Sequence, residues 1–156
     1  MDHFCIIPFQ KRHIPQVVEF EKELRRQEPD TYFWDPDEAY RESLERSFSD
    51  GRFQNAVSFL AVDIDKDKVI GRIDAVIIAA RSDPSCGSAY LDWICVLKSE
   101  RHRRVGQALL EALKEKLAEK HVGLLIALAA QNEEAQRFYR ATEGASMHDE
   151  GVWIEL

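Results

Sequence analysis

The stretch LDWICVLKSERHRRVGQA, residues 91–108, decides the fold. Its apolar beginning, LDWICV, predicts a strand, and the basic, glycine-containing turn after it leads directly into an amphipathic helix. A strand that ends in such a turn leaves several N–H groups of the helix pointing the same way, with a partial positive charge behind them. Three arginines, Arg101, Arg103 and Arg104, add formal charge at the same place. We therefore predict an anion site here, suited to the pyrophosphate of a cofactor.

The helix that leaves this turn, over residues 105–120, has the clearest pattern in the sequence. One side carries the apolar residues Val105, Ala108, Leu109, Ala112, Leu113 and Leu117. The run LLIALAA (124–130) then predicts a strand covered on both faces. Asn132 can cap a further helix that ends at Gly144, with Ala135, Phe138, Tyr139 and Thr142 on one face. GVWIEL (151–156) predicts a final strand.

Upstream of the deciding stretch, the sequence predicts three antiparallel strands. Residues 58–62 and 69–80 form the first two, joined by the polar turn DIDKDK, and a second turn at 81–88 leads into a strand over 89–97.

The N-terminal part predicts a strand at 3–9 and a helix that begins near Ile14 and ends before Pro29. The irregular stretch PDTYFWDPDEAY (29–40) follows, and a second helix starts within it. Asp35 suits the N-cap of that helix, Pro36 its first position, and Glu38 the closing of a capping box. The inward-facing residues of this helix are expected to be Tyr40, Leu44 and Phe48. The aromatic and acidic loop before it either lines a pocket or closes the edge of the core.

Together these elements predict an α/β (α+β) fold with one mixed central sheet. At 156 residues and 45% hydrophobic, the chain suits one domain over residues 1–156. A net charge of −7 leaves no basic face for general nucleic-acid binding. Since no run approaches the roughly 20 apolar residues of a membrane span and the N-terminus lacks a leader pattern, we expect a cytoplasmic protein with no membrane partner.

The three cysteines and five histidines predict no metal site. Cys5 and Cys95 fall in apolar strand patterns and are expected to be buried, and neither they nor Cys86 has a metal-ligand spacing. The histidines lie at no spacing typical of a zinc or catalytic site. We therefore expect neither a disulfide nor a bound metal.

Two segments resemble the signature regions of the GNAT N-acetyltransferase superfamily. The first is VLKSERHRRVGQALL (96–110), and the second is NEEAQRFYRATEGA (132–145), with its Asn, Ala, Phe-Tyr and Gly. The order of elements matches that fold as well, so the resemblance covers essentially the whole chain. It implies helices on both faces of the sheet and a splay between the fourth and fifth strands.

The first signature departs from the family at Arg104. When Val96 and the two leucines at 109–110 are aligned, Arg101 takes the family's Arg/Gln position, Gly106 its last glycine, and Arg104 the position of an earlier glycine. A register shifted by two residues also satisfies the short pattern. Because glycine serves where backbone approaches a ligand or adopts positive φ, we expect Arg104 to be nearly helical with its side chain pointing outward. Without the second signature, RHRR would be read as a solvated basic turn.

What the resemblance implies is a site for acetyl-CoA in the splay, with no metal. Its cofactor-binding residues would be Ile94, Cys95, Val96, Arg101, His102, Arg103, Arg104, Val105, Gly106, Gln107, Asn132 and Tyr139. Tyr139 matches the family's usual general acid, and a phenol stays protonated at pH 7. The alternative for Tyr139 is a core aromatic, and for Asn132 only a helix cap.

Asp92 is the candidate base. It stands where some members carry a glutamate, and simple alternation puts it on one strand face with Tyr90, Ile94 and Val96. A carboxylate in such surroundings suits a base or a partner for a cationic acceptor; the alternative is a solvated acid at the sheet margin. Tyr32 and Trp34 in the aromatic loop are the other candidate substrate-binding residues.

We therefore expect an N-acetyltransferase that moves an acetyl group from acetyl-CoA to a primary amine by direct attack in a ternary complex. The acceptor is a small molecule or a peptide N-terminus or lysine, and the acids Asp30, Asp35 and Asp92 favour a cationic one such as a polyamine, an aminoglycoside or an amino-acid amine. One alternative is a degenerate module that binds CoA or another anion as a sensor; another is an unrelated nucleotide-binding domain. A homodimer is possible.

Overall fold

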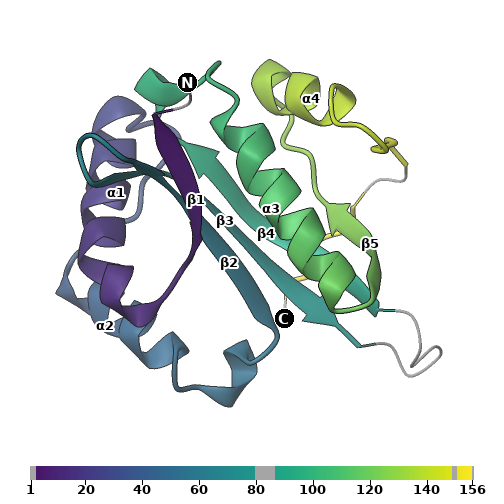
Figure 1. Cartoon of the computed structure of the whole chain (residues 1–156), viewed down its shortest axis with the longest axis horizontal. Coiled ribbons are helices and arrows are strands. Elements are labelled where there is room, and N and C mark those ends of the chain that lie inside the picture. Colours follow the sequence, from purple (N-terminus) through teal and green to yellow (C-terminus); the bar gives the residue numbers. More distant parts are fainter. Residues whose placement is uncertain (1–2, 80–86, 149–150, 156) are drawn as a thin grey trace.

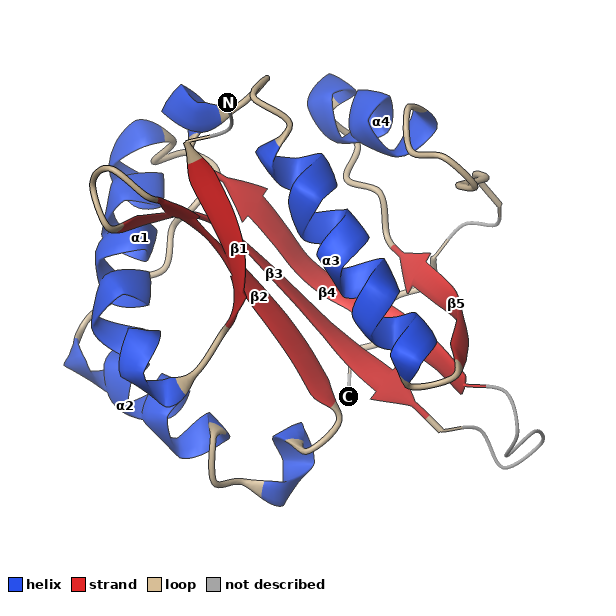
Figure 2. Ribbon diagram, in the orientation of Figure 1, coloured by secondary structure: helices blue, strands red, loops and turns tan. Residues whose placement is uncertain are grey.

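The computed structural model describes residues 3–79, 87–148 and 151–155. Its centre is a sheet of five strands in the order β1-β2-β3-β4-β5 (Figures 1 and 2). The strands are β1 (Phe4–Pro8), β2 (Ala56–Asp63), β3 (Lys68–Ile78), β4 (Gly87–Val96) and β5 (Val122–Ala127). Neighbours from β1 to β4 are antiparallel, and β4 and β5 are parallel. The predicted mixed sheet is confirmed.

The helices cover both faces of this sheet, as predicted. They are α1 (Ile14–Gln27), α2 (Glu38–Ser47), α3 (Val105–Glu119) and α4 (Glu133–Arg140). Successive strand residues point to opposite faces, and two neighbours on β3 show which helix lies where. Arg72 bonds to Glu21 of α1, whereas a Cβ at Gly71 would lie 3.0 Å from Leu109 of α3. The glycine therefore lets α3 cross close to the sheet.

The core forms where the apolar stripes of α1 and α3 meet the sheet. On α3 the buried residues are Val105, Leu109, Leu110, Leu113 and Leu117, close to the predicted stripe. On α1 they include Val17, Phe20 and Leu24, together with one charged residue, Glu21.

Two predictions for the C-terminal part are wrong. The strand predicted at 124–130 is observed at 122–127 as β5, the last strand in the sheet order, and it is covered by α3 on one face while its other face is exposed. Leu124 and Ile126 on the other side are 54% and 46% exposed. The final strand is absent from the described part of GVWIEL: residues 151–155 have no regular structure and their apolar side chains are exposed. The apolar run by itself did not indicate that one face of this strand is exposed.

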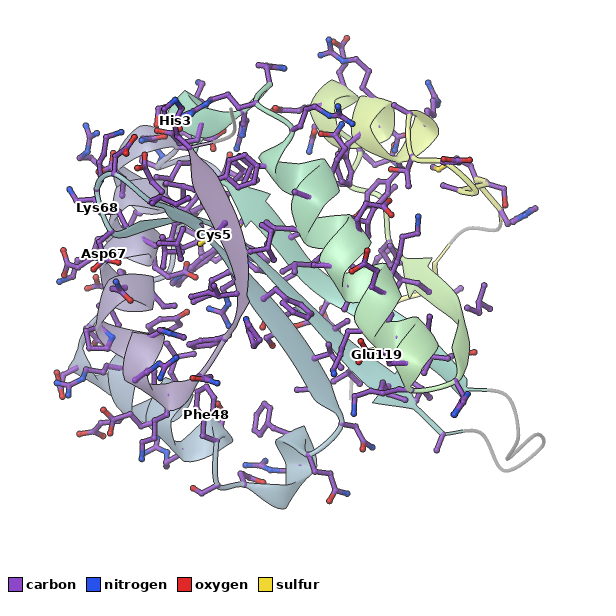
Figure 3. All side chains as sticks on the ribbon, viewed as in Figure 1. His3, Cys5, Phe48, Asp67, Lys68 and Glu119 are labelled. Atoms are coloured by element: carbon purple, nitrogen blue, oxygen red, sulfur yellow. The ribbon has the colours of Figure 1, made fainter. Side chains whose placement is uncertain are left out.

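Local signals were also misassigned. Asp37, not Asp35, caps α2 by accepting a hydrogen bond from the Tyr40 amide at 2.9 Å. α4 ends at Arg140, and Gly144 follows in the loop with a φ of 76°. Cys5 is exposed on the edge strand β1 (Figure 3), whereas Cys95 is buried as expected. Cys86 and most of the turn predicted at 81–88 lie outside the described residues.

Candidate active site

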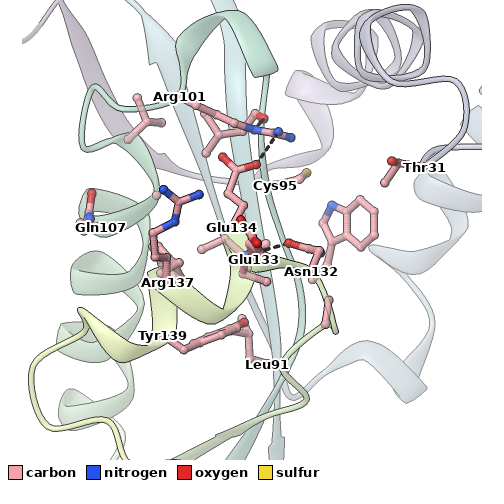
Figure 4. Close-up of a pocket in the computed structure, with 18 of the residues that line it drawn as sticks. Thr31, Leu91, Cys95, Arg101, Gln107, Asn132, Glu133, Glu134, Arg137 and Tyr139 are labelled. Carbon is pink, nitrogen blue, oxygen red and sulfur yellow. Dashed lines mark hydrogen bonds and ion pairs between the residues drawn. The ribbon is translucent and has the colours of Figure 1, made fainter.

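The splay predicted between the fourth and fifth strands begins at Leu91. Parallel pairing of β4 with β5 ends at the pair Leu91–Ala127, but β4 continues to Val96. Backbone groups of β4 that point away from β3 therefore lose their strand partner over the last five residues. A cavity of about 890 Å³ occupies this opening, bounded by β4, the start of α3 and α4 (Figure 4). Its volume lies within the roughly 300–1,000 Å³ of small-molecule sites.

Asp92 occupies a β-bulge at the start of the splay. Leu91 pairs with Ala75 and Trp93 with Asp74, so Asp92 is an extra residue without a partner on β3. Bulges re-aim side chains next to active sites and interrupt the regular alternation of faces. The alternation expected from sequence is therefore wrong: Ile94 pairs with Ile73, on the face opposite that of Tyr90. Asp92 itself is exposed.

The beginning of α3 provides free amide groups to this cavity. The N–H groups of Val105, Gly106 and Gln107 donate to no other described residue, since the first turn of a helix has no intrahelical acceptor for them. His102 and Arg104 have left-handed backbones, with φ of 62° and 64°. The expectation that Arg104 is nearly helical is wrong: it adopts the conformation for which the family's glycine is suited. Arg104 is exposed and lines the cavity.

Two of the three arginines near these amides are already paired. The Arg101 guanidinium is held by Glu28 at the end of α1, at 2.5 and 3.0 Å, and by Glu134 of α4 at 2.9 Å. Arg103 pairs with Glu100. The backbone amides and Arg104 therefore carry more of the positive potential at this site than the sequence indicated. Through these two glutamates Arg101 ties the turn after β4 to the end of α1 and to α4; its contact with Glu134 is shown in Figure 4.

Tyr139 reaches the cavity from α4. Asn132 caps this helix by accepting from the Ala135 amide at 2.8 Å, so its role as a cap is confirmed. Phe138 packs against α3 at a glycine, since a Cβ at Gly106 would lie 3.2 Å from its ring. Burial raises the pKa of the Tyr139 phenol, so it remains a proton donor well above neutral pH.

Most of the predicted site residues line this one cavity. They are Tyr32, Asp92, Ile94, Cys95, Val96, Arg101, His102, Arg104, Val105, Gly106, Gln107, Asn132 and Tyr139. Arg103 does not line it, and Trp34 lines a neighbouring cavity. Asp35 pairs with Arg25 at 3.0 Å, and neither Asp30 nor Asp35 lines either cavity.

The neighbouring cavity, of about 750 Å³, lies between α2, β2, β3 and the aromatic loop. Asp92 and Trp93 line both cavities, so the two meet at the bulge. Trp93 stacks edge-on against Trp34 and Tyr32, with ring centroids 5.2 and 5.8 Å away. The aromatic loop therefore lines pockets as well as closing the core; the sequence had left this open.

Sequence reasoning missed the charged cluster in this second cavity. Arg72 Nη1 donates to Glu21 at 3.2 Å, and its Nε lies 2.6 Å from Asp74. A signal was present in the sequence, because Glu21 interrupts the apolar stripe of α1, and Arg72 and Asp74 alternate along a strand. Nothing in the sequence linked these residues with one another. Glu28, Glu134 and Arg137 of the first cavity were missed as well.

Within residues 3–79, 87–148 and 151–155, no cluster of His, Cys, Asp and Glu is placed to hold a metal ion. Over the same ranges, no helix has the length and apolar character needed to span a membrane.

Solved structures share this fold. An aminoglycoside acetyltransferase from an uncultured soil metagenomic sample, in complex with sisomicin, superposes with a TM-score of 0.80 at 17% identity, covering 99% of this chain and 97% of that one. AAC(6')-Iy in complex with the bisubstrate analogue CoA-S-monomethyl-acetylneamine superposes with a TM-score of 0.76 at 22% sequence identity, covering 99% of this chain and 98% of that one. A ribosomal-protein-alanine N-acetyltransferase from Brucella melitensis biovar Abortus 2308 gives 0.73 at 17%, covering 98% of each.

Curated protein sequences give no match. The family model "Acetyltransferase (GNAT) family" matches residues 18–144. This range includes the whole first signature segment and all of the second except its last residue, Ala145. The chain therefore belongs to the GNAT acetyltransferase family.

Proposed function

We propose that the protein transfers an acetyl group from acetyl-CoA to a primary amine of a small molecule or peptide. One observation carries the proposal: the free amides of α3, the unpaired end of β4 and Tyr139 line one cavity, which meets a second, acidic cavity at Asp92. Acetyl-CoA supplies an activated thioester, so the protein has to position the reactants and move protons.

Each part of the first cavity has a role in this reaction. The amides of residues 105–107 and Arg104 bind the diphosphate, and the backbone of residues 94–96 holds the pantetheine arm. Asp92 takes a proton from the attacking ammonium, directly or through water, and Tyr139 donates one to the departing thiolate.

The attack is direct, without an acyl-enzyme. Cys95 lines the cavity, but it is 5% exposed and burial raises the pKa of its thiol well above the usual value. It therefore stays protonated at neutral pH and is a poor nucleophile. Trapping of an acetylated Cys95 during turnover would contradict direct attack.

Thiol release in the presence of acetyl-CoA and a panel of amines tests the activity. Tyr139→Phe is expected to lower kcat about 10²-fold or more, with the affinity for CoA retained, since it removes only the proton donor. Asp92→Asn is expected to lower kcat similarly, because the amide cannot accept the proton of the attacking ammonium. Normal turnover in both variants would overturn these assignments.

The second candidate is a CoA-binding module without catalysis. The pairing of Arg101 with Glu28 favours it, because this ion pair reduces the free positive charge available to a diphosphate. Thermal stabilisation by CoA, with no thiol release for any amine, would establish this function instead.

We also propose that the protein works in the cytoplasm as a homodimer. The exposed apolar residues of β5 continue into Leu128, which lies against Gly151 at the start of a segment with Val152, Trp153 and Ile154 exposed. Contiguous apolar surface of this kind marks an interface. Sedimentation should give a dimer, and Ile126→Asp should give a monomer with its CoA affinity intact.

A further inference from the structure

The second cavity contains a buried acid with an unused oxygen. Glu21 is 1% exposed, and its Oε1 accepts from Arg72. Its Oε2 is buried and accepts no well-formed hydrogen bond from the described residues, and the same holds for Asp74 Oδ2 despite its ion pair with Arg72. A buried carboxylate oxygen without a donor is costly, and such a group in a cavity wall calls for an explanation. Burial is also the main cause that raises the pKa of this carboxyl. The Arg72 charge and the neighbouring Tyr40 and Trp34 side chains partly offset this effect of burial on the pKa.

The cluster around Glu21 has more negative than positive charge. Among the residues that the structure describes, Arg72 is the one cation that lines the cavity, and it is shared between Glu21 and Asp74. Asp74 also accepts from Ser58 at 2.5 Å. With Glu21 and Asp74 both ionised, one negative charge is left over, and a bound ammonium group would stabilise this ionised state against the effect of burial. Asp50, on the same wall, is already neutralised by Arg52 at 2.6 Å.

A second acid, Asp92, lines the same cavity. Asp92, at the junction with the first cavity, forms no ion pair with any described residue. The same cavity wall also includes the apolar and aromatic residues Trp34, Leu44, Phe48 and Trp93. The cavity thus offers two places for positive charge together with an apolar surface suited to methylene groups or a ring.

Building on the proposed function, we infer that the acceptor is a polycationic amine, and that Glu21 with Asp74 selects it by binding its second, non-reacting ammonium group. The reacting amine lies at Asp92, and the distal ammonium is the counter-charge that the Glu21–Arg72–Asp74 cluster lacks. An amino acid is disfavoured because its carboxylate would face this excess of acids. Linear diamines and aminoglycosides share the required chemistry.

The test is a comparison of matched amines in the wild type and in Glu21→Gln. Each of 1,4-diaminobutane, 1,6-diaminohexane and neamine is assayed at saturating acetyl-CoA, with n-butylamine and n-hexylamine as matched monoamines. At least one polycation should have a KM about tenfold or more below its monoamine at similar kcat. A lower KM for a diamine than for neamine would indicate a linear polyamine acceptor, and the reverse order would indicate an aminoglycoside.

Glu21→Gln and Asp74→Asn should each raise the KM for the preferred polycation about tenfold, with kcat and the monoamine constants unchanged. Glu23→Gln is the control on the same helix, because Glu23 pairs with Arg26 and lines neither cavity. Calorimetric titration with CoA verifies that each variant is folded, because the proposed CoA site lies in the first cavity and does not include the substituted residues.

Equal KM values for monoamines and polycations, or an unchanged preference in both cluster variants, would overturn the inference while the acetyltransferase proposal stands. If no amine is acetylated, the proposed function fails, and direct titration with 1,6-diaminohexane still decides the inference: binding that Glu21→Gln abolishes supports it, and absence of binding overturns it.

Discussion

Arg104 stands where the signature that this chain resembles has a glycine. It is the N-cap of α3, with φ 64° and ψ 11°, and it has no side-chain hydrogen bond to the helix. A left-handed backbone costs a residue with a Cβ roughly 1–2 kcal/mol relative to glycine. The strain lies at the amides proposed to bind diphosphate, where the arginine adds charge in return.

Arg104→Gly should therefore stabilise the fold by about 1 kcal/mol, raising Tm by about 2–4 °C, since relief of strain outweighs the entropy that glycine adds to the unfolded chain. Thermal unfolding followed by circular dichroism measures this. Arg104→Ala removes the same charge but keeps the Cβ, so it should give no such gain; an equal gain would show that charge repulsion, not backbone strain, was relieved.

At the scale of elements, capping determines where α2 and α4 begin. α4 has eight residues, none of them buried, and is held by the Asn132 cap, the contact of Phe138 with Gly106 and the bridge from Arg101 to Glu134. Because Tyr139 is carried by this short helix, its position depends on those contacts.

The start of α2 offers a direct comparison of two aspartates. Asp37→Ala should lower the free energy of unfolding by about 1 kcal/mol, because it leaves the Tyr40 amide without its acceptor. Asp35→Ala removes only an exposed ion pair with Arg25 and should cost no more than a few tenths of a kcal/mol. Urea denaturation measures both, and the reverse order would assign the cap to Asp35.

At the scale of the whole molecule, three partly or fully buried tyrosines link stability to alkaline pH. Burial raises the pKa of Tyr40 to about 12 and raises the pKa values of Tyr32 and Tyr139. Above pH 10 the unfolded chain loses phenolic protons that the folded chain retains, so folding stability falls as pH rises from 10 to 12.

Tyr40→Phe should remove about 1–2 kcal/mol of this decrease. Chemical denaturation at pH 8, 10, 11 and 12 gives the free energy of unfolding of each protein, and the slope of that free energy against pH is compared between Tyr40→Phe and the wild type. The comparison of slopes does not depend on how the substitution changes stability at neutral pH. Parallel curves for the variant and the wild type would show that the Tyr40 phenol does not contribute.

Patterns within single segments predicted most of the fold. The stripe of α3, the alternating strands and the Asn132 cap are local signals, and the structure has each of them within a few residues. The two signature segments identified the family because they include residues such as Gly106 and Tyr139 at fixed spacing. The amides of α3 followed from the order strand, basic turn, helix, without knowledge of any distant contact.

The sequence by itself thus determined the elements, their order and the first cavity's amides, because hydrophobic period and helix ends are properties of neighbouring residues. Only the tertiary structure decided the exposed face of β5, the bulge at Asp92, the pairing of Arg101 with Glu28 and the cluster of Glu21, Arg72 and Asp74. Each of these features depends on which segments that are distant in sequence come into contact. Burial and ion pairing result from those tertiary contacts, and the pattern within one segment does not specify them.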